Sequence, residues 1–235
     1  MRLPTLAAAA ALALVVAALP AAAQSRRSFS YDNAFRLSAG VFEPEGDSAY
    51  WEDAEQDFTG DVTDFEDLTL SIDYVRELRG NLRLVVGGSI YEGSDTLAYR
   101  DFVDNNDDPI LHDTTLTIAA ATLGLEFRLA PRSSPVVPYL GVGAGLYSWS
   151  LEESGDFVDF GATPLEIFSA DFDDDGVATG YWFTAGLDVP VSSSFAFFVR
   201  GRWHFAEDDL EGDFEDLGEL DLSGQEIAAG LSWSF

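Results

Sequence analysis

The last ten residues of the chain, Glu226 to Phe235, read Glu-Ile-Ala-Ala-Gly-Leu-Ser-Trp-Ser-Phe and decide the fold. Every odd position in this stretch is apolar, whereas every even position is small or polar. A strict period of two predicts a β-strand with two different faces, because a helix would repeat its apolar residues about every 3.6 positions. Large apolar side chains on one face and small or polar ones on the other suit a strand with lipid outside and a packed polar lumen inside.

The same alternation recurs in seven earlier segments of the chain. Each segment is long enough to cross a bilayer as a tilted strand of about 9 to 11 residues. The sequence therefore predicts an all-β fold, an eight-stranded antiparallel up-and-down transmembrane β-barrel. The predicted strands span residues 34–43, 66–77, 81–92, 114–129, 136–151, 177–190, 194–206 and 222–235.

The connections between the predicted strands alternate in length and differ in charge. Three short turns lie at 78–80, 130–135 and 191–193. The other four connections hold 36 of the 42 acidic residues and a single basic residue, Arg100. Short periplasmic turns opposite longer extracellular loops are typical of outer-membrane barrels, so we expect long acidic loops outside the cell. The four long connections are residues 43–67, 92–113, 152–175 and 207–221.

The inward faces of the predicted strands carry charges of both signs. A barrel of eight strands has an interior just wide enough for side chains to fill it. Because buried charges persist when they are paired and hydrogen-bonded, we expect an ion-pair network inside the barrel. The alternative is a gated solute path through the same charges. The predicted network consists of Arg36, Asp73, Arg83, Glu126, Arg128, Asp188, Arg200, Arg202 and Glu226.

The N-terminus has the features of a secretion signal. Arg2 precedes an apolar run from Ala7 to Leu19, and Ala21-x-Ala23 resembles a signal-peptidase site. The apolar run is shorter than the about 20 residues that a membrane-spanning helix requires. We therefore expect a cleaved signal peptide at 1–23, a short periplasmic leader at 24–33 and a barrel at 34–235.

The composition excludes several classes of protein. The chain has no cysteine, which excludes a disulfide framework, a thiolate metal site and a cysteine nucleophile. The net charge is −30, and phosphate binding requires clustered cations, so we expect no nucleic-acid partner. The basic residues are all arginine, which is better suited than lysine to buried, multiply hydrogen-bonded ion pairs.

One acidic motif resembles part of a cation site. Asp171-x-Asp173-x-Asp175-Gly176 matches the first half of an EF-hand calcium loop, but the position of the bidentate glutamate is occupied by Trp182. An EF-hand is therefore excluded. Loosely bound calcium at Asp171, Asp173 and Asp175 is a weaker expectation, and a solvated loop extended by charge repulsion is the alternative. No other cofactor is expected.

The two histidines of the chain, His112 and His204, are the candidates for a catalytic residue. His204 has inward parity, and no serine lies two residues away from it in either direction, so we predict a hydrogen-bonded lumen residue near the extracellular rim. His112 lies in a predicted loop beside Asp113, and we predict an exposed polar residue there. No catalytic residue is assigned, and we expect a protein that is not an enzyme.

The strand pattern, the alternating connections and the terminal Trp233-Ser234-Phe235 resemble the small porin-like outer-membrane barrels of Gram-negative bacteria, of the OmpA/OmpX type. The resemblance covers residues 34–235. It implies an integral outer-membrane protein in contact with lipid and lipopolysaccharide, and a monomer. It also implies that Trp233 and Phe235 form a signal read by the outer-membrane assembly machinery.

The resemblance implies a non-enzymatic role in the envelope or at the cell surface, with a side-chain-filled lumen and acidic loops that present carboxylates to cations or other partners. An OmpW-like conduit for small hydrophobic solutes is the alternative, since that family is also eight-stranded. A lipid-modifying outer-membrane enzyme, similar to the lipid A deacylases, is a third and weaker hypothesis.

Overall fold

The computed structural model describes residues 32–235, except for the side chain of Asp216. The predicted signal peptide at 1–23 and residues 24–31 of the predicted leader lie outside the described residues. Within residues 32–235, no helix combines the length and the apolar character that crossing a membrane would require.

The described chain consists mainly of long antiparallel strands, with one α-helix and two 3-10 helices in the connections. The strands are β1 (Asn33–Pro44), β2 (Asp67–Glu77), β3 (Leu82–Val103), β4 (Pro109–Arg128), β5 (Val137–Asp159), β6 (Glu166–Pro190), β7 (Phe195–Asp209), β8 (Glu219–Asp221) and β9 (Gly224–Ser234). The helices are α2 (Ala49–Asp57), η1 (Val62–Phe65) and η2 (Gly212–Leu217).

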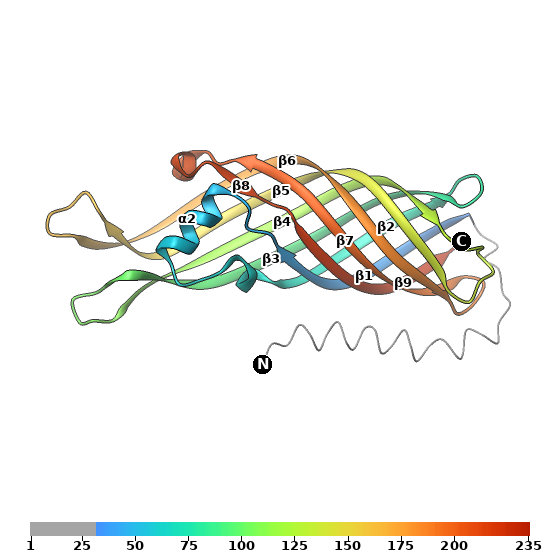
Figure 1. The fold of residues 1–235 in the computed structure, drawn as a ribbon, viewed down its shortest axis with the longest axis horizontal. Coiled ribbons are helices and arrows are strands. Elements are labelled where there is room, and N and C mark those ends of the chain that lie inside the picture. The colour runs from blue at the N-terminus through green and yellow to red at the C-terminus, as the bar shows by residue number, and fades with distance from the viewer. Residues whose placement is uncertain (1–31) are drawn as a thin grey trace.

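Eight of the strands close into a ring, which confirms the predicted fold class (Figure 1). Each of β1 to β7 pairs with its neighbour in sequence, and β9 closes the ring by pairing with both β1 and β7. The three-residue β8 is an addition to the end of β7. Closure gives both backbone edges of every strand a partner, which a membrane-spanning sheet requires because lipid cannot hydrogen-bond to peptide groups.

The last strand closes the barrel with its terminal aromatic residue on the outside. The backbone N–H of Phe235 donates to the carbonyl oxygen of Asn33 at 2.9 Å, and its ring stacks on Phe35 at 5.4 Å between centroids. Trp233 also faces outward, with its ring 5.6 Å from that of Phe235. The pairing of β9 with β1 is the closure that an up-and-down barrel requires, in agreement with the predicted fold.

An apolar belt surrounds the ring, as the period of two predicted. The belt ends where outward residues become charged or polar, for example at Glu92 after Ile90 on β3. Most of its side chains are exposed to the surroundings of the protein. They include Phe35, Leu37, Leu68, Leu70, Ile72, Val86, Ile90, Leu123, Leu125, Phe127, Leu140, Val142, Leu146, Val177, Tyr181, Phe183, Phe195, Phe197, Trp203, Ile227, Leu231 and Trp233.

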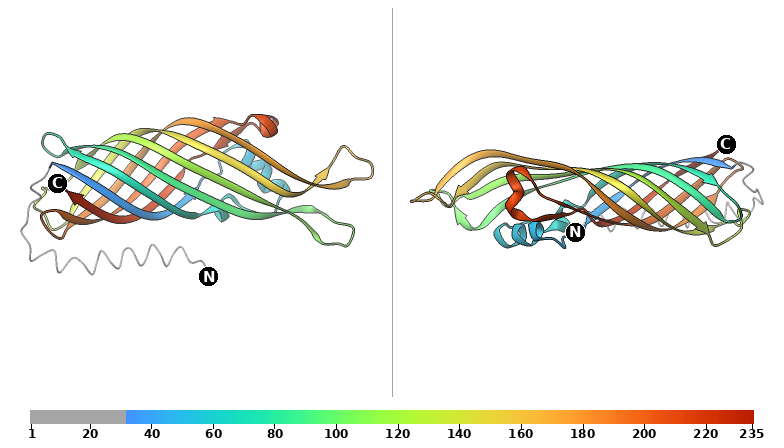
Figure 2. Two further views of the ribbon diagram at one scale, coloured as in Figure 1. Left: turned by 180° about the vertical axis from the view of Figure 1, so that it is seen from behind. Right: turned by 90° about the horizontal axis from the view of Figure 1, so that it is seen from above.

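Two of the predicted loops are largely strand. The connections at 92–113 and 152–175 were expected to be irregular, but β3, β4, β5 and β6 continue far beyond the belt and leave only 104–108 and 160–165 as connections. The acidic residues that suggested loops lie mainly on the outward face of these strands, where water solvates them. Figures 1 and 2 show the two resulting hairpins projecting from one end of the barrel. We call this four-stranded projection the extension.

The connection at 43–67 also has regular structure. It contains α2 and η1, and α2 lies over the extension and η2, next to β8 (Figure 2). The indole Nε1 of Trp51 in α2 donates to the carbonyl oxygen of Asp221 on β8 at 3.3 Å. The helix therefore covers an inner face that the ring alone would leave open.

Candidate functional site

Four charged side chains from four strands converge in the half of the lumen nearest the short turns. Arg36 on β1 donates to Glu126 on β4 at 3.0 Å and to Asp188 on β6 at 3.2 Å. Arg83 on β3 contacts the same carboxylates at 2.7 Å and 2.6 Å. All four side chains are buried, and the two positive charges balance the two negative ones. We call this group the turn-end cluster.

An aromatic ring supports the turn-end cluster. The guanidinium carbons of Arg36 and Arg83 lie 5.0 Å and 4.7 Å from the ring centroid of Tyr139 on β5. A Cβ at Gly186 on the neighbouring β6 would lie 2.3 Å from this ring, so only glycine leaves space for it. Cation–π contact adds to the ion pairs because both guanidinium groups are removed from water.

A second charge cluster lies further from the turns. Arg200 on β7 pairs with Asp73 on β2 and with Glu226 on β9, the latter at 3.0 Å. Arg202 is 3.7 Å from Asp73 and stacks on Trp182 at 4.7 Å from the ring centroid. These four charged side chains are also buried and balanced. We call Asp73, Arg200, Arg202 and Glu226 the mid-lumen cluster.

Small residues on β4 and β5 make room for the indole of Trp182. A Cβ at Gly124 or Gly143 would lie within 2.5 Å of its ring atoms. Gly141, Gly143 and Gly145 have inward parity on β5. Gly145 lies beside Tyr147, but the main occupant of this space is the tryptophan on β6.

Arg128 has a partner that the sequence prediction missed. Its Nη2 lies 2.8 Å from Oε2 of Glu77 and donates to the carbonyl oxygen of Gly80 at 3.2 Å. Glu77 follows Asp73 by four residues on β2 and therefore has the same inward parity, so continuing the alternation would have found it. The Nη2 of Arg132, from the turn after β4, is 3.7 Å from the carboxylate of Glu77.

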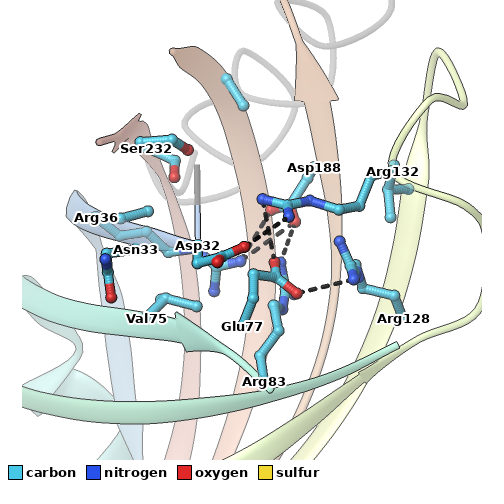
Figure 3. A pocket seen from close by; sticks show the side chains of 14 residues that line it. Asp32, Asn33, Arg36, Val75, Glu77, Arg83, Arg128, Arg132, Asp188 and Ser232 are labelled. Atoms are coloured by element: carbon cyan, nitrogen blue, oxygen red, sulfur yellow. Dashed lines mark hydrogen bonds and ion pairs between the residues drawn. The ribbon is translucent and has the colours of Figure 1, made fainter. Parts of the chain in front are cut away.

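Figure 3 shows these groups around a cavity at the turn end of the lumen. The cavity has a volume of about 30 Å³ and is lined by Arg36, Arg83, Arg128, Glu77 and Asp188, among others. This is room for no more than a few water molecules. The charges therefore fill the lumen at this level.

Above the mid-lumen cluster the interior becomes apolar. Inward residues of β1 and of β3 to β7 meet residues from α2, η1 and the last connection, which contains η2 and β8, in one buried cluster that we call the aromatic plug. A cavity of about 20 Å³ lies at its lower edge. The plug consists of Phe42, Tyr50, Trp51, Val62, Phe65, Tyr91, Leu116, Ile118, Ala120, Tyr147, Trp149, Leu151, Ala178, Ala206, Leu210, Phe214, Leu220 and Leu222.

The plug was not predicted, although part of its signal is in the sequence. Tyr147, Trp149 and Leu151 continue the inward parity of β5, and they turn apolar where the predicted strand ended. The contribution of α2 could not be read in this way, because its two buried residues, Tyr50 and Trp51, stand alone in an acidic segment.

A buried polar contact fastens α2 to the extension. The hydroxyl of Tyr50 donates to Oε1 of Glu153 on β5 at 2.7 Å. Burial raises the pKa of the Glu153 carboxyl, although the hydrogen bond from Tyr50 opposes this shift. Burial and the nearby Glu153 carboxylate raise the pKa of the Tyr50 hydroxyl well above its ordinary value. The tyrosine therefore stays protonated and serves as the hydrogen-bond donor.

His112 is not the exposed loop residue that the sequence suggested. It lies on the inner face of β4 in the extension, with 1% of its surface exposed. Its ring is 4.5 Å from Phe58 and 5.0 Å from Phe157, measured between centroids. Neither ring nitrogen has a hydrogen-bond partner among the described residues. Burial lowers the pKa of His112 to about 4, so the ring is neutral at neutral pH.

His204 lies in the lumen, between the mid-lumen cluster and the plug. Its Nδ1 is 3.1 Å from the hydroxyl of Tyr147, and its Nε2 is 3.8 Å from the carboxylate of Glu226. This is the hydrogen-bonded lumen position that parity predicted.

The structure does not bring Asp171, Asp173 and Asp175 together. All three lie exposed on the outward face of β6, where successive outward residues are about 7 Å apart along the strand. The inward Asp174 between them accepts the backbone N–H of Glu211 at 2.7 Å. Among residues 32–235, no group of three or more histidine, aspartate or glutamate side chains is arranged to hold a metal ion.

Comparisons with known proteins give one family and several structures. The family model described as "Outer membrane protein beta-barrel domain" matches residues 8–235. A search of curated proteins found no significant sequence match.

Three solved structures share the fold at low sequence identity. The outer membrane protein OprG from Pseudomonas aeruginosa has a TM-score of 0.55 and 11% identity, with 89% of this chain and 98% of that chain covered. Neisserial surface protein A has a TM-score of 0.50, 14% identity, and coverage of 86% and 96%. A major outer membrane protein from Thermus thermophilus has a TM-score of 0.51, 9% identity, and coverage of 86% and 99%. At these identities the likeness concerns the fold alone.

Proposed function

We propose that this chain, which belongs to the outer membrane protein beta-barrel domain family, is a closed, non-enzymatic barrel. It presents a rigid acidic surface outside the cell. As a member of that family it is an integral protein of the outer membrane. The short turns then face the periplasm and the extension projects from the cell, since outer-membrane barrels have short periplasmic turns and longer extracellular connections.

The observation that carries the proposal is the double occupation of the lumen. The turn-end and mid-lumen clusters fill the part of the barrel nearest the short turns with balanced ion pairs, and the aromatic plug fills the part above these clusters. A solute crossing the barrel would have to separate buried charges and then displace an apolar core. Separating the charges is costly, because an unpaired buried charge is strongly unfavourable. Displacing the plug would also cost the burial of its apolar side chains.

Planar-bilayer recording tests whether the lumen is closed. We expect no steady conductance from the purified protein. A steady conductance that disappears when Arg200 and Arg202 are both changed to glutamine would overturn the proposal, because it would place the ion path through the mid-lumen cluster. Arg76→Gln is the matched control, since Arg76 is exposed on the outside of β2.

A conduit for small hydrophobic solutes is the second candidate function, and one observation favours it. The upper lumen is apolar, and α2 covers it through a small number of polar contacts, including that of Tyr50 with Glu153. If the helix moves aside, an apolar solute could enter the plug region. Uptake of a hydrophobic dye into protein-containing vesicles, increased by Tyr50→Phe, would support the conduit over the closed barrel.

The absence of enzymatic activity is part of the proposal. His204, on strand β7 of the ring, points into the lumen toward Tyr147 and Glu226 rather than toward lipid. This arrangement does not favour attack on a lipid ester at the outer surface. Deacylation of lipopolysaccharide by the purified protein, lost in His204→Gln, would contradict it.

We also propose that the acidic outer surface attracts divalent cations loosely. The separation of Asp171, Asp173 and Asp175 favours weak binding by single carboxylates over a defined calcium site, since calcium prefers six to eight oxygen ligands. Calorimetry with calcium is the test. No heat at millimolar concentration would remove this part of the proposal.

The remaining partners follow from the belt and the last strand. We propose that the belt contacts lipid and lipopolysaccharide, that Trp233 and Phe235 are read by the assembly machinery, and that the protein acts as a monomer. The exposed aromatic side chains at the end of β9 support the second point, because an assembly factor could reach them while the strand is being added.

A further inference from the structure

The two hairpins of the extension separate at their ends and leave a cleft between them. The ladder between β4 and β5 ends at the pair His112 and Gly155, and the chain beyond it diverges (Figure 1). The cleft has a volume of about 340 Å³, far larger than the two lumen cavities described above. We call it the tip cleft. Its volume lies in the range of ligand-binding pockets, which is about 300 to 1,000 Å³.

Six of the eight residues that line the tip cleft are apolar, and the other two are Asn105 and Glu166. Phe102, Val103 and Ile110 line it from the β3–β4 hairpin, and Val158, Leu165 and Ile167 line it from the β5–β6 hairpin. The exposed fractions of Val103, Leu165 and Ile167 are 55%, 49% and 40%. These side chains are far from lipid, because Val103 follows the last belt residue of β3, Ile90, by 13 residues, or roughly 40 Å of strand. An apolar patch in water at this distance from the membrane indicates a binding surface.

Aromatic contacts hold the two hairpins together at the cleft. Phe102 and Phe160 lie 5.2 Å apart between ring centroids, and Tyr99 is 6.4 Å from Phe160. The hydroxyl of Tyr99 also accepts the backbone N–H of Val158 at 3.4 Å. The cleft is therefore built by contacts between the hairpins, and its shape does not depend on two independent loops.

The surroundings of the cleft are strongly acidic. Residues 99–112 and 155–168 contain seven carboxylates and one arginine. The arginine, Arg100, donates from Nε to the carbonyl oxygen of Glu55 at 3.0 Å and is thus directed toward α2. Glu166 itself lines the cleft. The carboxylates are Asp101, Asp104, Asp107, Asp108, Asp156, Asp159 and Glu166.

We propose that the tip cleft binds a cationic amphipathic polypeptide segment from outside the cell, with apolar side chains in the cleft and lysine or arginine side chains against its acidic surroundings. The inference rests on the proposed function, because it requires the extension to be presented at the cell surface. Charge complementarity excludes two other occupants. A second copy of this chain would bring another net charge of −30 to the same site, and the phosphates of lipopolysaccharide would be repelled.

The test is fluorescence anisotropy with a labelled synthetic peptide and the full protein in nanodiscs of zwitterionic phosphatidylcholine. The probe is an amphipathic helix of leucine and lysine of about 18 residues, or five turns. A counterpart with glutamate in place of lysine and empty nanodiscs provide the baselines. We expect saturable binding of the lysine peptide above both baselines, weakened several-fold between about 50 and 300 mM salt because exposed charges are screened.

Two paired variants locate the site. Val103→Ser with Leu165→Ser should weaken binding by about tenfold or more, because two apolar side chains lose their burial in the complex. Asp108→Asn with Glu166→Gln should weaken binding several-fold and reduce its dependence on salt. Leu111→Ser and Asp173→Asn are the matched controls, since both residues are exposed on the outward face of the same two hairpins and lie outside the cleft.

Equal binding by all four variants, equal binding of the glutamate peptide, or no binding above empty nanodiscs would overturn the proposal. Binding of a neutral hydrophobic dye in place of the peptide would do the same. If the serine variant disturbs the extension, which hydrogen exchange of β4 and β5 would reveal, the carboxylate variant decides the question. A closed barrel in bilayer recordings together with no peptide binding would contradict the tip cleft alone and leave the proposed closure intact.

Discussion

The extension continues four of the eight strands of the barrel, β3 to β6, yet the inner faces of the barrel and the extension differ in chemistry. Within the belt, the inner face of the ring holds arginines and carboxylates paired at 2.6 to 3.2 Å in the turn-end cluster. From the upper part of the belt into the extension, the inner faces of β3 to β6 hold much of the aromatic plug and His112. One chain therefore builds a charged interior near the short turns and an apolar interior toward the extension.

The chemistry of each inner face follows from the surroundings of the outer face of the same strands. Where the ring is closed and lipid lies outside, the outer face is already apolar and the enclosed face can be polar, provided that every charge has a partner. Where the sheet leaves the membrane, its outer face is solvated and acidic, so the inner face must supply the hydrophobic core. The helix α2 completes that core, because four strands alone do not enclose it.

The largest expected effect is the loss of a charge from the turn-end cluster. Arg36→Met leaves Glu126 and Asp188 with Arg83 alone, and removing one partner of a buried ion pair costs about 3 to 5 kcal/mol. We expect this decrease in the free energy of unfolding, measured by urea titration in lipid vesicles. Arg76→Met, on the outer surface of β2, should change it by less than about 0.5 kcal/mol. Similar values for the two variants would show that the cluster does not stabilise the barrel.

Acidification should loosen the extension and spare the ring. The pKa of His112 is about 4 in the folded protein, below the ordinary value of about 6.5. The unfolded extension therefore binds more protons between these values, so its stability is complete above pH 6.5 and falls as the pH approaches 4. The full loss is at most about 3 kcal/mol. Hydrogen exchange of β4 as a function of pH measures it.

His112→Phe provides the control for the pH effect, because phenylalanine suits the aromatic surroundings and does not titrate. This variant should remove the loss of protection between pH 6.5 and 4. Glu153 acts with the opposite sign, since its raised pKa makes the folded form take up a proton first on acidification. An undiminished loss of protection in His112→Phe would assign the pH effect to other groups.

A smaller effect is expected where α2 is fastened to the extension. Tyr50→Phe removes the hydroxyl that donates to Glu153 and leaves a buried carboxylate without that partner. Hydrogen bonds to charged groups contribute about 1.5 to 3 kcal/mol, so local opening of residues 49–57 should become easier by about 2 kcal/mol. Hydrogen exchange of α2 would report this change. Asp53→Asn, at an exposed position of the same helix, should leave the exchange unchanged, and a shared response would refute a specific contact.

The smallest effect on stability is expected at the C-terminus. Deletion of Phe235 removes an aromatic stack with Phe35, worth about 0.5 to 1.5 kcal/mol. Refolding in detergent should therefore change little, whereas the amount of protein assembled in cells should fall strongly if the assembly machinery reads this residue. Phe195→Ala alters another exposed aromatic residue at the start of β7, at the turn end of the barrel, and should affect neither measurement strongly. Equal losses in cells and in detergent would mean that Phe235 is only a packing residue.

The period of two predicted each strand and its outward face, because alternation is a local property of a strand. The ring and its strand order were predicted from this period together with the alternating connection lengths and the resemblance to outer-membrane barrels. The same parity placed Arg36, Asp73, Arg83 and the other predicted charges on the inner face. It could not assign partners. Arg128 pairs with Glu77, for example, and no local pattern matches these two residues, because pairing across the lumen depends on the stagger of strands that are distant in sequence.

The extension is the region whose structure the local sequence pattern does not predict. Its strands carry acidic residues on the outward face, and in a window of sequence these resemble a solvated loop. For the same reason His112 beside Asp113 is predicted to be exposed, whereas it is buried by rings from other segments, including Phe58 after α2 and Phe157 on β5. The buried residues of α2, Tyr50 and Trp51, likewise have no periodic signal in their own segment.

The sequence alone predicts a two-faced strand repeated eight times, alternating short and long connections, and an interior that carries both signs of charge. These follow from alternation and composition, which each residue carries without reference to distant parts of the chain. The tertiary structure is needed to see which charges form pairs. It also shows that the upper interior is apolar and that two hairpins form a cleft beyond the belt. Those features arise from contacts between segments far apart in sequence, and their geometry is fixed when the ring closes and sets the register of every strand.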